Sequence, residues 1–397
     1  MPEGPWWEHL ESNFWERPEG FELALRDLVR VRATAAFDVA VRTGLASLIA
    51  PLTVPVGYHP VALRAMFGER KVYERAAESG DPRRFFAAPP DAIEMTSAEA
   101  GWPHFEARGG RCRDLRFESA YVPLNARLRD RYLAHEANRF ARARYWSHGG
   151  RARSTIIAVH GFAGDPYWLN QWLFALPWFY SIGCDVLLVT LPFHGARRTR
   201  GSVVSGQGFF SGGTSWINEA FGQAVMDVRS FVGWLERERG VERIGVTGIS
   251  LGGYTAALLA AVDDRLQFAI PNVPLVSLPD LVLEWEPLGS LMRAAMLVTG
   301  TSIKTVRRAL AVHSPLTYPP LLDRERLMII GGVGDRLAPP KHSRLLWDHW
   351  GRCRIHWFPG SHSIHLDRGD YLRRMGRFLN EIGFNVDRRR RRSARVA

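Results

Sequence analysis

The chain has 397 residues, 46% of them hydrophobic and 23% charged, which excludes a disordered or fibrous protein and predicts a sizeable folded core. The net charge is +12, partly because six arginines lie at residues 388–392 and 395; no nucleic-acid-binding module accompanies them, so we expect no nucleic-acid partner. The three cysteines, Cys112, Cys184 and Cys353, lack metal-binding spacing and predict free thiols in a cytoplasmic protein without a metal site.

Residues 1–110 are expected to form a helical extension ahead of the main domain. The first twenty residues, rich in Trp, Glu and Pro, show no secretory signal pattern and predict an irregular arm. Apolar residues at three- and four-residue steps over residues 21–51 predict helix.

Residues 33–57 approach the ~20 apolar residues that a membrane span needs. Asp38 and Arg42 interrupt this stretch, and Pro51 and Pro55 are expected to break its end. We therefore expect an amphipathic or buried helix pair in a cytoplasmic protein. Peripheral contact with an anionic membrane is the alternative.

Two strands are expected where the main domain begins. Residues 78–110, rich in Pro and Gly, predict a connector. Residues 113–122 and 138–146 show side-chain alternation, which predicts an antiparallel hairpin at the edge of a sheet.

Strands alternate with helices from residue 154 onward. The predicted strands cover residues 154–161, 184–191, 244–247, 266–276, 327–330 and 352–358, and the predicted helices cover residues 167–180, 217–239, 254–262, 340–350 and 371–382. This alternation predicts an α/β fold with a mainly parallel sheet and helices on both faces. Ligands of such sheets bind beyond the carboxyl ends of the strands.

The sequence Gly248-Ile249-Ser250-Leu251-Gly252 follows one of these strands and opens a helix. This is the context that a nucleophile elbow requires. The hydroxyl of Ser250 must project from a strained turn, and side chains at Gly248 and Gly252 would collide with the neighbouring strand and helix. The sequence therefore predicts Ser250 as a nucleophile.

A serine hydroxyl needs a base to take its proton and a carboxylate to hold that base. Asp335 and His362 each follow a predicted strand, so we expect them at the same sheet edge as Ser250. The order Ser, acid, His is that of an α/β-hydrolase triad. The backbone N–H groups of Leu251 and Phe162, the latter after His160-Gly161, are the expected oxyanion donors.

Five motifs in this order resemble the α/β-hydrolase superfamily over roughly residues 138–385. They read VHGFAGD, LPFHGARR, GISLGGY, GGVGDRLAPP and FPGSHSIHL. The resemblance implies an α/β-hydrolase fold and hydrolysis of an ester, thioester or amide in a small-molecule acyl substrate that it does not specify. We expect no cofactor. The family pattern places the base directly after the glycine-containing turn, at His362; His365 would point away if a helix began there.

Other residues compete for these roles. Asp280 and Glu284 are the alternative acids, because some family members place the acid after the preceding strand. His160 is expected to be a structural residue under the oxyanion loop, and His194 a turn residue lining the pocket. A protein of this fold that binds a ligand without catalysis is the competing function.

The expected main domain covers residues 111–386 and contains an insertion at about residues 279–323. Its many apolar residues, broken by Pro287, Gly289 and Gly300, predict a helical lid over Ser250. Residues 387–397 are expected to be a disordered basic tail. The function we expect is that of a serine hydrolase, with a membrane-surface lipid esterase as a variant; the oligomeric state stays open.

Overall fold

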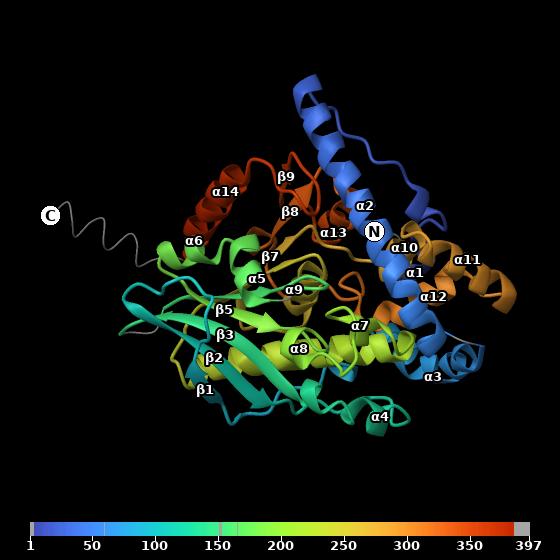
Figure 1. The fold of residues 1–397 in the computed structure, drawn as a ribbon, viewed down its shortest axis with the longest axis horizontal. Helices are drawn as coiled ribbons and strands as arrows, with labels where there is room; N and C mark the ends of the chain where they lie inside the picture. Colours follow the sequence, from blue (N-terminus) through green and yellow to red (C-terminus); the bar gives the residue numbers. More distant parts are fainter. Residues whose placement is uncertain (1–3, 59, 151–152, 165, 385–397) are drawn as a thin grey trace.

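The computed structural model describes residues 4–58, 60–150, 153–164 and 166–384. The predicted basic tail therefore lies outside the described residues. The molecule has three layers, a twisted sheet with helices on each side of it, and a long N-terminal helix runs along one side (Figure 1).

A nine-stranded sheet forms the centre, in the order β1-β2-β3-β5-β4-β6-β7-β8-β9. The strands from β5 to β9 in this order pair in parallel, and β1, β2 and β3 join them antiparallel. Their bounds are β1 Thr96–Glu99, β2 Gly110–Glu118, β3 Phe140–His148, β4 Thr155–Val159, β5 Asp185–Thr190, β6 Ile244–Ile249, β7 Leu266–Asn272, β8 Met328–Gly332 and β9 Arg354–Phe358. The mainly parallel sheet and the β2–β3 hairpin are confirmed. Strand β1 was not predicted, because its four residues are all exposed and carry no apolar pattern.

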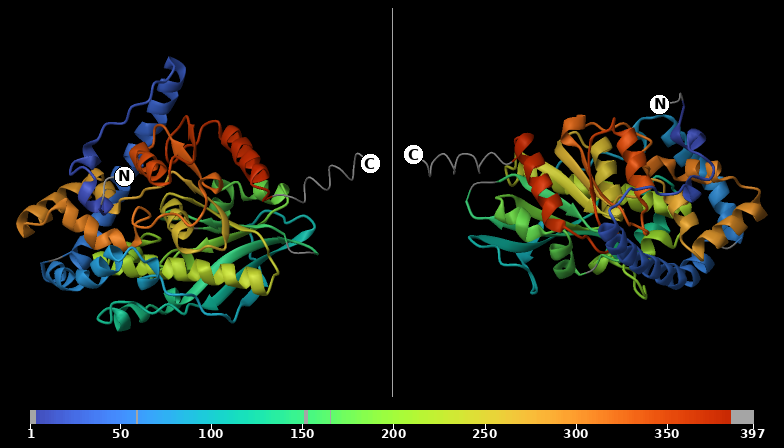
Figure 2. Two further views of the ribbon diagram at one scale, coloured as in Figure 1. Left: turned by 180° about the vertical axis from the view of Figure 1, so that it is seen from behind. Right: turned by 90° about the horizontal axis from the view of Figure 1, so that it is seen from above.

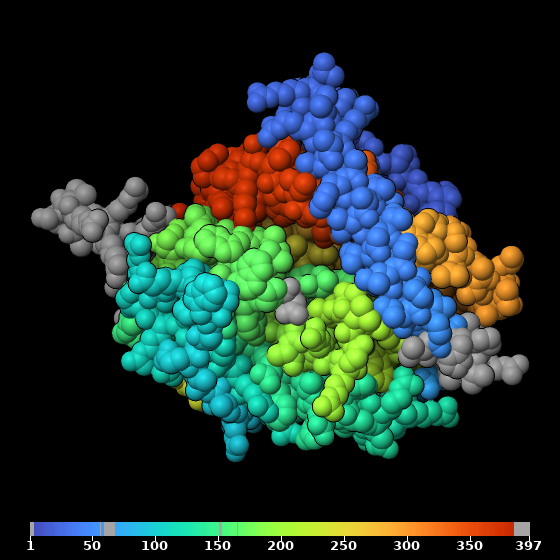
Figure 3. All heavy atoms as spheres, viewed as in Figure 1, coloured from blue at the N-terminus to red at the C-terminus, as the bar shows by residue number. Residues whose placement is uncertain are grey.

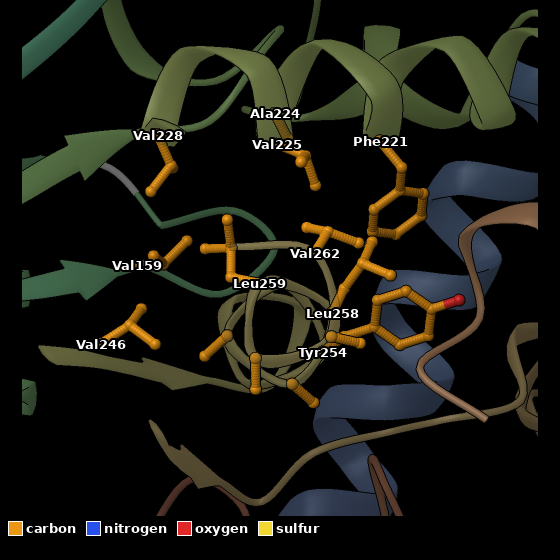
Figure 4. Packing of buried hydrophobic residues seen from close by; sticks show 14 of the residues in the cluster. Val159, Phe221, Ala224, Val225, Val228, Val246, Tyr254, Leu258, Leu259 and Val262 are labelled. Atoms are coloured by element: carbon orange, nitrogen blue, oxygen red, sulfur yellow. The ribbon is translucent and has the colours of Figure 1, made fainter. Parts of the chain in front are cut away.

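Helices cover both faces of this sheet. One face packs against α8 (Thr214–Arg237), α9 (Leu251–Val262) and α13 (Pro340–His349). The other packs against α5 (Tyr167–Leu173), α6 (Leu176–Ser181) and α14 (Arg368–Glu381). Figure 4 shows the first core, where valine and leucine side chains of α8 and α9 meet Val159 of β4 and Val246 of β6. The central strands β4 and β5 are buried on both sides, which is why their sequences read as continuous apolar runs.

The remaining helices are short or belong to the two additions. They are α1 Trp6–His9, α2 Leu25–Gly57, α3 Pro60–Glu78, α4 Arg129–Leu133, α7 Gln207–Phe210, α10 Leu278–Glu284, α11 Leu288–Thr299 and α12 Ile303–Leu310. Single 3-10 turns lie at Phe14–Glu16, Pro82–Arg84, Glu136–Arg139, Gly195–Arg197, Ala311–His313 and Arg324–Arg326. Helices α10 to α12 occupy the predicted insertion and lie beside α2 (Figure 1).

The helix expected over residues 21–51 is present, but the helix pair expected from the apolar stretch 33–57 is wrong there: α2 is one helix of 33 residues that includes Pro51 and Pro55. It extends along one side of the molecule (Figure 2). Both prolines are exposed, and each removes one N–H donor from the helix. Tertiary contacts hold the last turn in place. The Tyr58 hydroxyl donates to the Phe210 carbonyl, and a Cβ on Gly57 would come within 2.2 Å of the Ser211 carbonyl.

The predicted helix at residues 167–180 is two helices, α5 and α6, separated at Ala175 with φ 52°. Pro177 explains the break, since it has no N–H to donate to the Leu173 carbonyl and its ring would clash with it. The carbonyls of Trp172 and Leu173 instead accept hydrogen bonds from the Arg368 guanidinium.

Candidate active site

Ser250 stands on a strained turn between β6 and α9, with φ 58° and ψ −117°. Such a backbone costs of order 1–3 kcal/mol in a residue other than glycine and persists only where its surroundings enforce it. A Cβ on Gly248 would lie 2.0 Å from the Gly252 carbonyl oxygen, and one on Gly252 would lie 1.8 Å from the Val159 carbonyl oxygen. The steric need for glycine at these two positions is confirmed.

Asp335 follows β8 and His362 follows β9, and the two side chains meet. Oδ2 of Asp335 lies 2.7 Å from Nδ1 of His362, and both residues are buried. Oδ1 of Asp335 accepts the N–H groups of Leu337 and Ala338 at 2.9 and 2.8 Å. The carboxylate is therefore fixed by its own loop, and Nε2 is the ring nitrogen left to exchange a proton.

The charge around His362 favours its protonated form. Burial by itself lowers the pKa of His362, but the Asp335 carboxylate, its hydrogen bond to the ring and the charge of Asp38 raise it, and the net pKa is raised. An imidazole of this kind can accept a proton from a hydroxyl and hold it during a reaction.

Ser250 and His362 line the same cavity of about 790 Å³, together with Gly161, Phe162 and Leu251. Figure 3 shows a hollow between α2, α5 and the C-terminal part of the chain, where these segments surround the cavity. Parallel strands bring their carboxyl ends to one edge, so the loops after β4, β6, β8 and β9 converge here.

The loop after β4 runs close to Ser250. A Cβ on Gly161 would lie 3.3 Å from Cβ of Ser250, so a side chain there would crowd the serine. Phe162 comes next and lines the cavity. Leu251 is the first residue of α9, where N–H groups have no acceptor within the helix. The chain thus brings both expected donors to the wall beside Ser250.

His160 holds this loop from beneath. Its Nε2 accepts the N–H of Leu191 at 3.0 Å, and its Nδ1 is 2.7 Å from the Gly161 carbonyl, to which it donates. Burial lowers the pKa of His160 to about 4, so the ring is neutral at physiological pH. These contacts agree with a structural role.

The expectation that His194 lines the pocket is wrong. Its ring is completely buried, with centroids 5.0 Å from His160 and 6.0 Å from Phe162, and it is absent from the cavity wall among the described residues. Nδ1 bonds to the Pro192 carbonyl at 2.8 Å. The turn after β5 thus keeps His194 within the core, where its ring packs against His160 and Phe162.

The alternative acids are engaged elsewhere. Asp280 forms a buried ion pair with Arg307, whose Nη2 lies 2.6 Å from Oδ1. Glu284 pairs with Lys341, with Nζ 3.0 Å from Oε1. Among the described residues, the carboxylate that bonds the His362 ring is Asp335.

His365 does not point away from the site, because no helix begins there; α14 starts at Arg368. It lines the cavity, and its Nε2 and Nδ1 contact the His362 carbonyl and the Tyr371 hydroxyl at 3.1 and 3.2 Å. Burial lowers the pKa of His365 to about 4. Its ring therefore supports the backbone of His362.

The cavity wall is mainly apolar, and about half of its residues come from the two additions to the core. Helix α2 contributes Val41, Leu45 and Ile49. The insertion contributes a larger group, namely Leu281, Val282, Trp285, Leu288, Leu291, Met292, Ala295 and Met296. Both additions therefore face the space in front of Ser250.

Asp38 of α2 belongs to this site, a role that was not predicted from the sequence. It is completely buried and contacts the loop that carries His362. The available signal was an acidic residue inside the apolar stretch 33–57, since such a carboxylate is buried only where donors satisfy it. Its partners lie about 300 residues further along the chain and could not be read from local sequence.

Comparison with known proteins agrees with the fold. The family model for alpha/beta hydrolase domain containing 18 matches residues 122–282, which include Ser250. The uncharacterized protein Rv2627c of Mycobacterium tuberculosis (strain H37Rv) is 28% identical over 366 residues, 88% of this chain and 81% of that protein. Another uncharacterized protein, MT2702 of strain CDC 1551, is 29% identical over 291 residues, 71% of this chain and 66% of its own.

Two solved structures share the architecture. Acetyl xylan esterase 1 from Thermoanaerobacterium sp. aligns with a TM-score of 0.53 and 17% identity over 79% of this chain and 92% of its own. Acetyl xylan esterase from Paenibacillus sp. R4 aligns with a TM-score of 0.52 and 15% identity over 79% of this chain and 94% of its own. At this identity the likeness concerns the fold. The sheet order, the elbow and the family match together identify the chain as a member of the α/β-hydrolase superfamily.

Proposed function

We propose that the protein is a serine hydrolase that cleaves a carboxylic ester through an acyl-enzyme intermediate. The observation that carries this proposal is the Asp335–His362 pair, which opens onto the same cavity as a serine held on a strained elbow. In this proposal Ser250 is the nucleophile, His362 the general base and Asp335 the group that orients it.

The reaction proceeds in two balanced steps. Oγ of Ser250 attacks the acyl carbon while Nε2 of His362 takes the hydroxyl proton, and the carbonyl oxygen becomes an oxyanion facing the N–H groups of Phe162 and Leu251. His362 then gives its proton to the leaving oxygen, and the alcohol departs. Water repeats the sequence on the acyl-enzyme and releases the acid and the free serine.

The apolar walls supplied by α2 and α11 favour an ester with an apolar acyl group. We propose that residues 279–323 act as a lid that excludes water from this group. Exclusion of water strengthens the interaction between the oxyanion and its donors. Thioesters and amides use the same chemistry and are second choices.

Fluorophosphonate labelling tests the proposal directly. The probe should attach to Ser250, and Ser250→Ala should abolish labelling and lower kcat by several orders of magnitude with an unchanged thermal midpoint. Ser277→Ala is a control at a buried serine outside the cavity lining. Equal labelling of the Ser250→Ala protein would contradict a serine mechanism and would favour a non-catalytic binding protein.

A second candidate, a hydrolase that works at a lipid surface, is favoured by the uncovered face of α2. Among the described residues, Leu25–Pro55 is the one segment long and apolar enough to cross a membrane by length and composition. Crossing would pull Asp38 away from its hydrogen-bond donors into hydrocarbon. Contact along the surface leaves those bonds intact.

The exposed apolar side chains on both flanks of the hollow suit this contact. Phe37 and Leu48 lie on α2, and Trp168 and Trp172 lie on α5. Tryptophan prefers the interface between lipid and water. The basic tail would add attraction to anionic lipid, which salt would weaken.

Vesicle sedimentation separates this candidate from the soluble one. Leu48→Asp should weaken binding to phosphatidylcholine–phosphatidylglycerol vesicles. Leu321→Asp is the matched control, because Leu321 is exposed and its N–H bonds to Ala260 near the far end of α9. If the unaltered protein does not bind the vesicles, the lipid-surface candidate is excluded. If the unaltered protein forms a dimer in size-exclusion chromatography and Leu48→Asp dissociates it, the exposed face of α2 binds a second copy of this chain.

A further inference from the structure

Asp38 receives four hydrogen bonds from the two loops that carry Asp335 and His362. Oδ2 accepts the backbone N–H of His362 at 2.7 Å and that of Arg336 at 3.1 Å. Oδ1 accepts the Ser361 hydroxyl at 3.0 Å and the N–H of Ser363 at 3.1 Å. Each oxygen thus has two donors, which is the usual limit for a buried carboxylate.

These bonds join two loops that the sheet leaves independent. Arg336 directly follows Asp335 after β8, whereas residues 361–363 follow β9. Oδ1 of Asp38 bonds to the loop after β9, at residues 361 and 363. Oδ2 bonds to both loops, at residue 362 after β9 and at residue 336 after β8. A carboxylate that binds both loops fixes the distance between the acid and the base.

The packing of α2 against these loops is close enough to transmit this constraint. A Cβ on Gly334 would lie 2.7 Å from Cγ1 of Val31 and 3.1 Å from the Val31 carbonyl oxygen. Glycine at 334 therefore lets α2 touch the backbone one residue before Asp335. The Arg42 guanidinium, one turn after Asp38, donates to the Arg336 carbonyl at 3.0 Å, so α2 binds both the N–H and the carbonyl of Arg336.

We infer that Asp38 is a positioning residue for His362: the N-terminal helix lies outside the hydrolase core but completes the active site by holding the base loop and the acid loop in register. This inference rests on the proposed function, since it assigns His362 the role of base. It explains why a helix with an exposed apolar face carries a buried acid at this position.

The carboxylate also acts through its charge. Among the described residues, the charged and titratable groups around His362 include Asp335 on the ring, Asp38 on the backbone and His365 at the carbonyl. Arg42 and Arg336 lie next to Asp38, and Arg368 lies near His365 on the cavity wall. Asp335 and Asp38 both favour the protonated imidazole. Removing one negative charge while keeping the side chain's shape should make His362 easier to deprotonate.

Asp38→Asn in the full-length protein tests the inference, because the amide has nearly the same shape but lacks the charge and one acceptor oxygen. Misplacement of a catalytic group by about 1 Å can cost about 100-fold, so we expect kcat for a p-nitrophenyl ester to fall by about 10- to 100-fold with little change in KM. The acidic limb of the pH profile of kcat/KM should move to lower pH. A role in packing alone would not move this limb.

Thr34→Val is the matched control. Thr34 is buried on α2 one turn before Asp38, and its hydroxyl bonds locally to the Val31 carbonyl at 3.0 Å. This variant should retain the kcat and the pH profile of the unaltered protein. If both variants lose the same activity and melting temperature while the limb stays in place, Asp38 merely docks α2 and the inference is overturned.

Two further measurements keep the test decisive. If Asp38→Asn does not fold, Ser361→Ala is the substitute, because it removes one hydrogen-bond donor and leaves the Asp38 carboxylate in place. A fall in kcat at an unchanged melting temperature would support the inference. An unchanged kcat would contradict it. NMR titration of the His362 ring reads the effect of Asp38 without turnover. A lack of Ser250 labelling in the unaltered protein would refute the proposed function, whereas an unmoved His362 titration would overturn the inference about Asp38.

Discussion

Nδ1 of His362 lies 2.7 Å from Oδ2 of Asp335, although 26 residues and a complete helix, α13, separate them in the chain. The contact arises because β8 and β9 are parallel neighbours whose carboxyl ends lie side by side. The same edge holds the loops of Phe162 and Ser250.

Substitutions of the proposed base and acid should distinguish the catalytic residues from the residues next to them. His362→Ala should lower kcat as severely as Ser250→Ala, because members of a triad act as a unit. His365→Ala should be mild, since the hydrogen bonds of its ring go to the His362 carbonyl and the Tyr371 hydroxyl and not to the side chain of Asp335, His362 or Ser250. Steady-state kinetics on a short-chain ester checks both. A harmless Asp335→Asn combined with a damaging Asp280→Asn would move the acid assignment.

Activity should depend on pH through His362. Its pKa is raised because Asp335 and Asp38 outweigh burial, and the imidazole must be neutral to accept the Ser250 proton. We therefore expect kcat/KM to fall with decreasing pH through a value above the ~6.5 of free histidine. His160, with its pKa lowered to about 4 by burial, stays neutral in this range. A profile that is flat from pH 8 to pH 6 would exclude His362 as the base.

Charge placed on the insertion should select against long acyl chains. Leu291→Asp and Met292→Asp put a carboxylate on the cavity wall, and burying it beside an apolar chain is unfavourable. Hydrolysis of a decanoate ester should fall at least tenfold more than that of an acetate ester. Leu297→Asp is the control on the same helix, because Leu297 is exposed and outside the described cavity lining. Equal losses on both esters would contradict a lid that contacts the acyl chain.

The buried Asp280–Arg307 pair should be a major stabilising contact, because it joins α10 to α12 and Arg307 also bonds to the N-terminal arm. Arg307 donates to both oxygens of Asp280 and to the carbonyls of Leu10 and Glu11 at 2.8 Å, and both charges are fully buried. Arg307→Ala should lower the free energy of unfolding by about 3–5 kcal/mol, because it leaves an unpaired buried carboxylate.

Urea denaturation measures this loss. Lys304 lies on the same helix as Arg307 and forms an exposed pair with Glu8 of α1, so Lys304→Ala should cost about 1 kcal/mol or less. Similar losses of unfolding free energy in the two variants would show that the buried pair stabilises the fold no more than the exposed pair does.

The sequence by itself determined the elements whose signals are local. Continuous apolar runs identified the buried strands, and Gly248 and Gly252 identified the elbow, because a turn with no room for Cβ atoms restricts residue type within five positions. The chain order of Ser250, Asp335 and His362 indicated the site, since parallel strands bring successive loops to one edge. These features need no knowledge of distant packing.

Only the tertiary structure decided the rest. Pro51 and Pro55 stay within α2 because contacts with residues 210 and 211 hold its last turn, and propensity alone cannot register such contacts. The break at Ala175 and the burial of His194 likewise depend on neighbours from other elements. Asp38 is the clearest case: four donors about 300 residues away satisfy its carboxylate, and long-range pairing leaves no trace in local sequence.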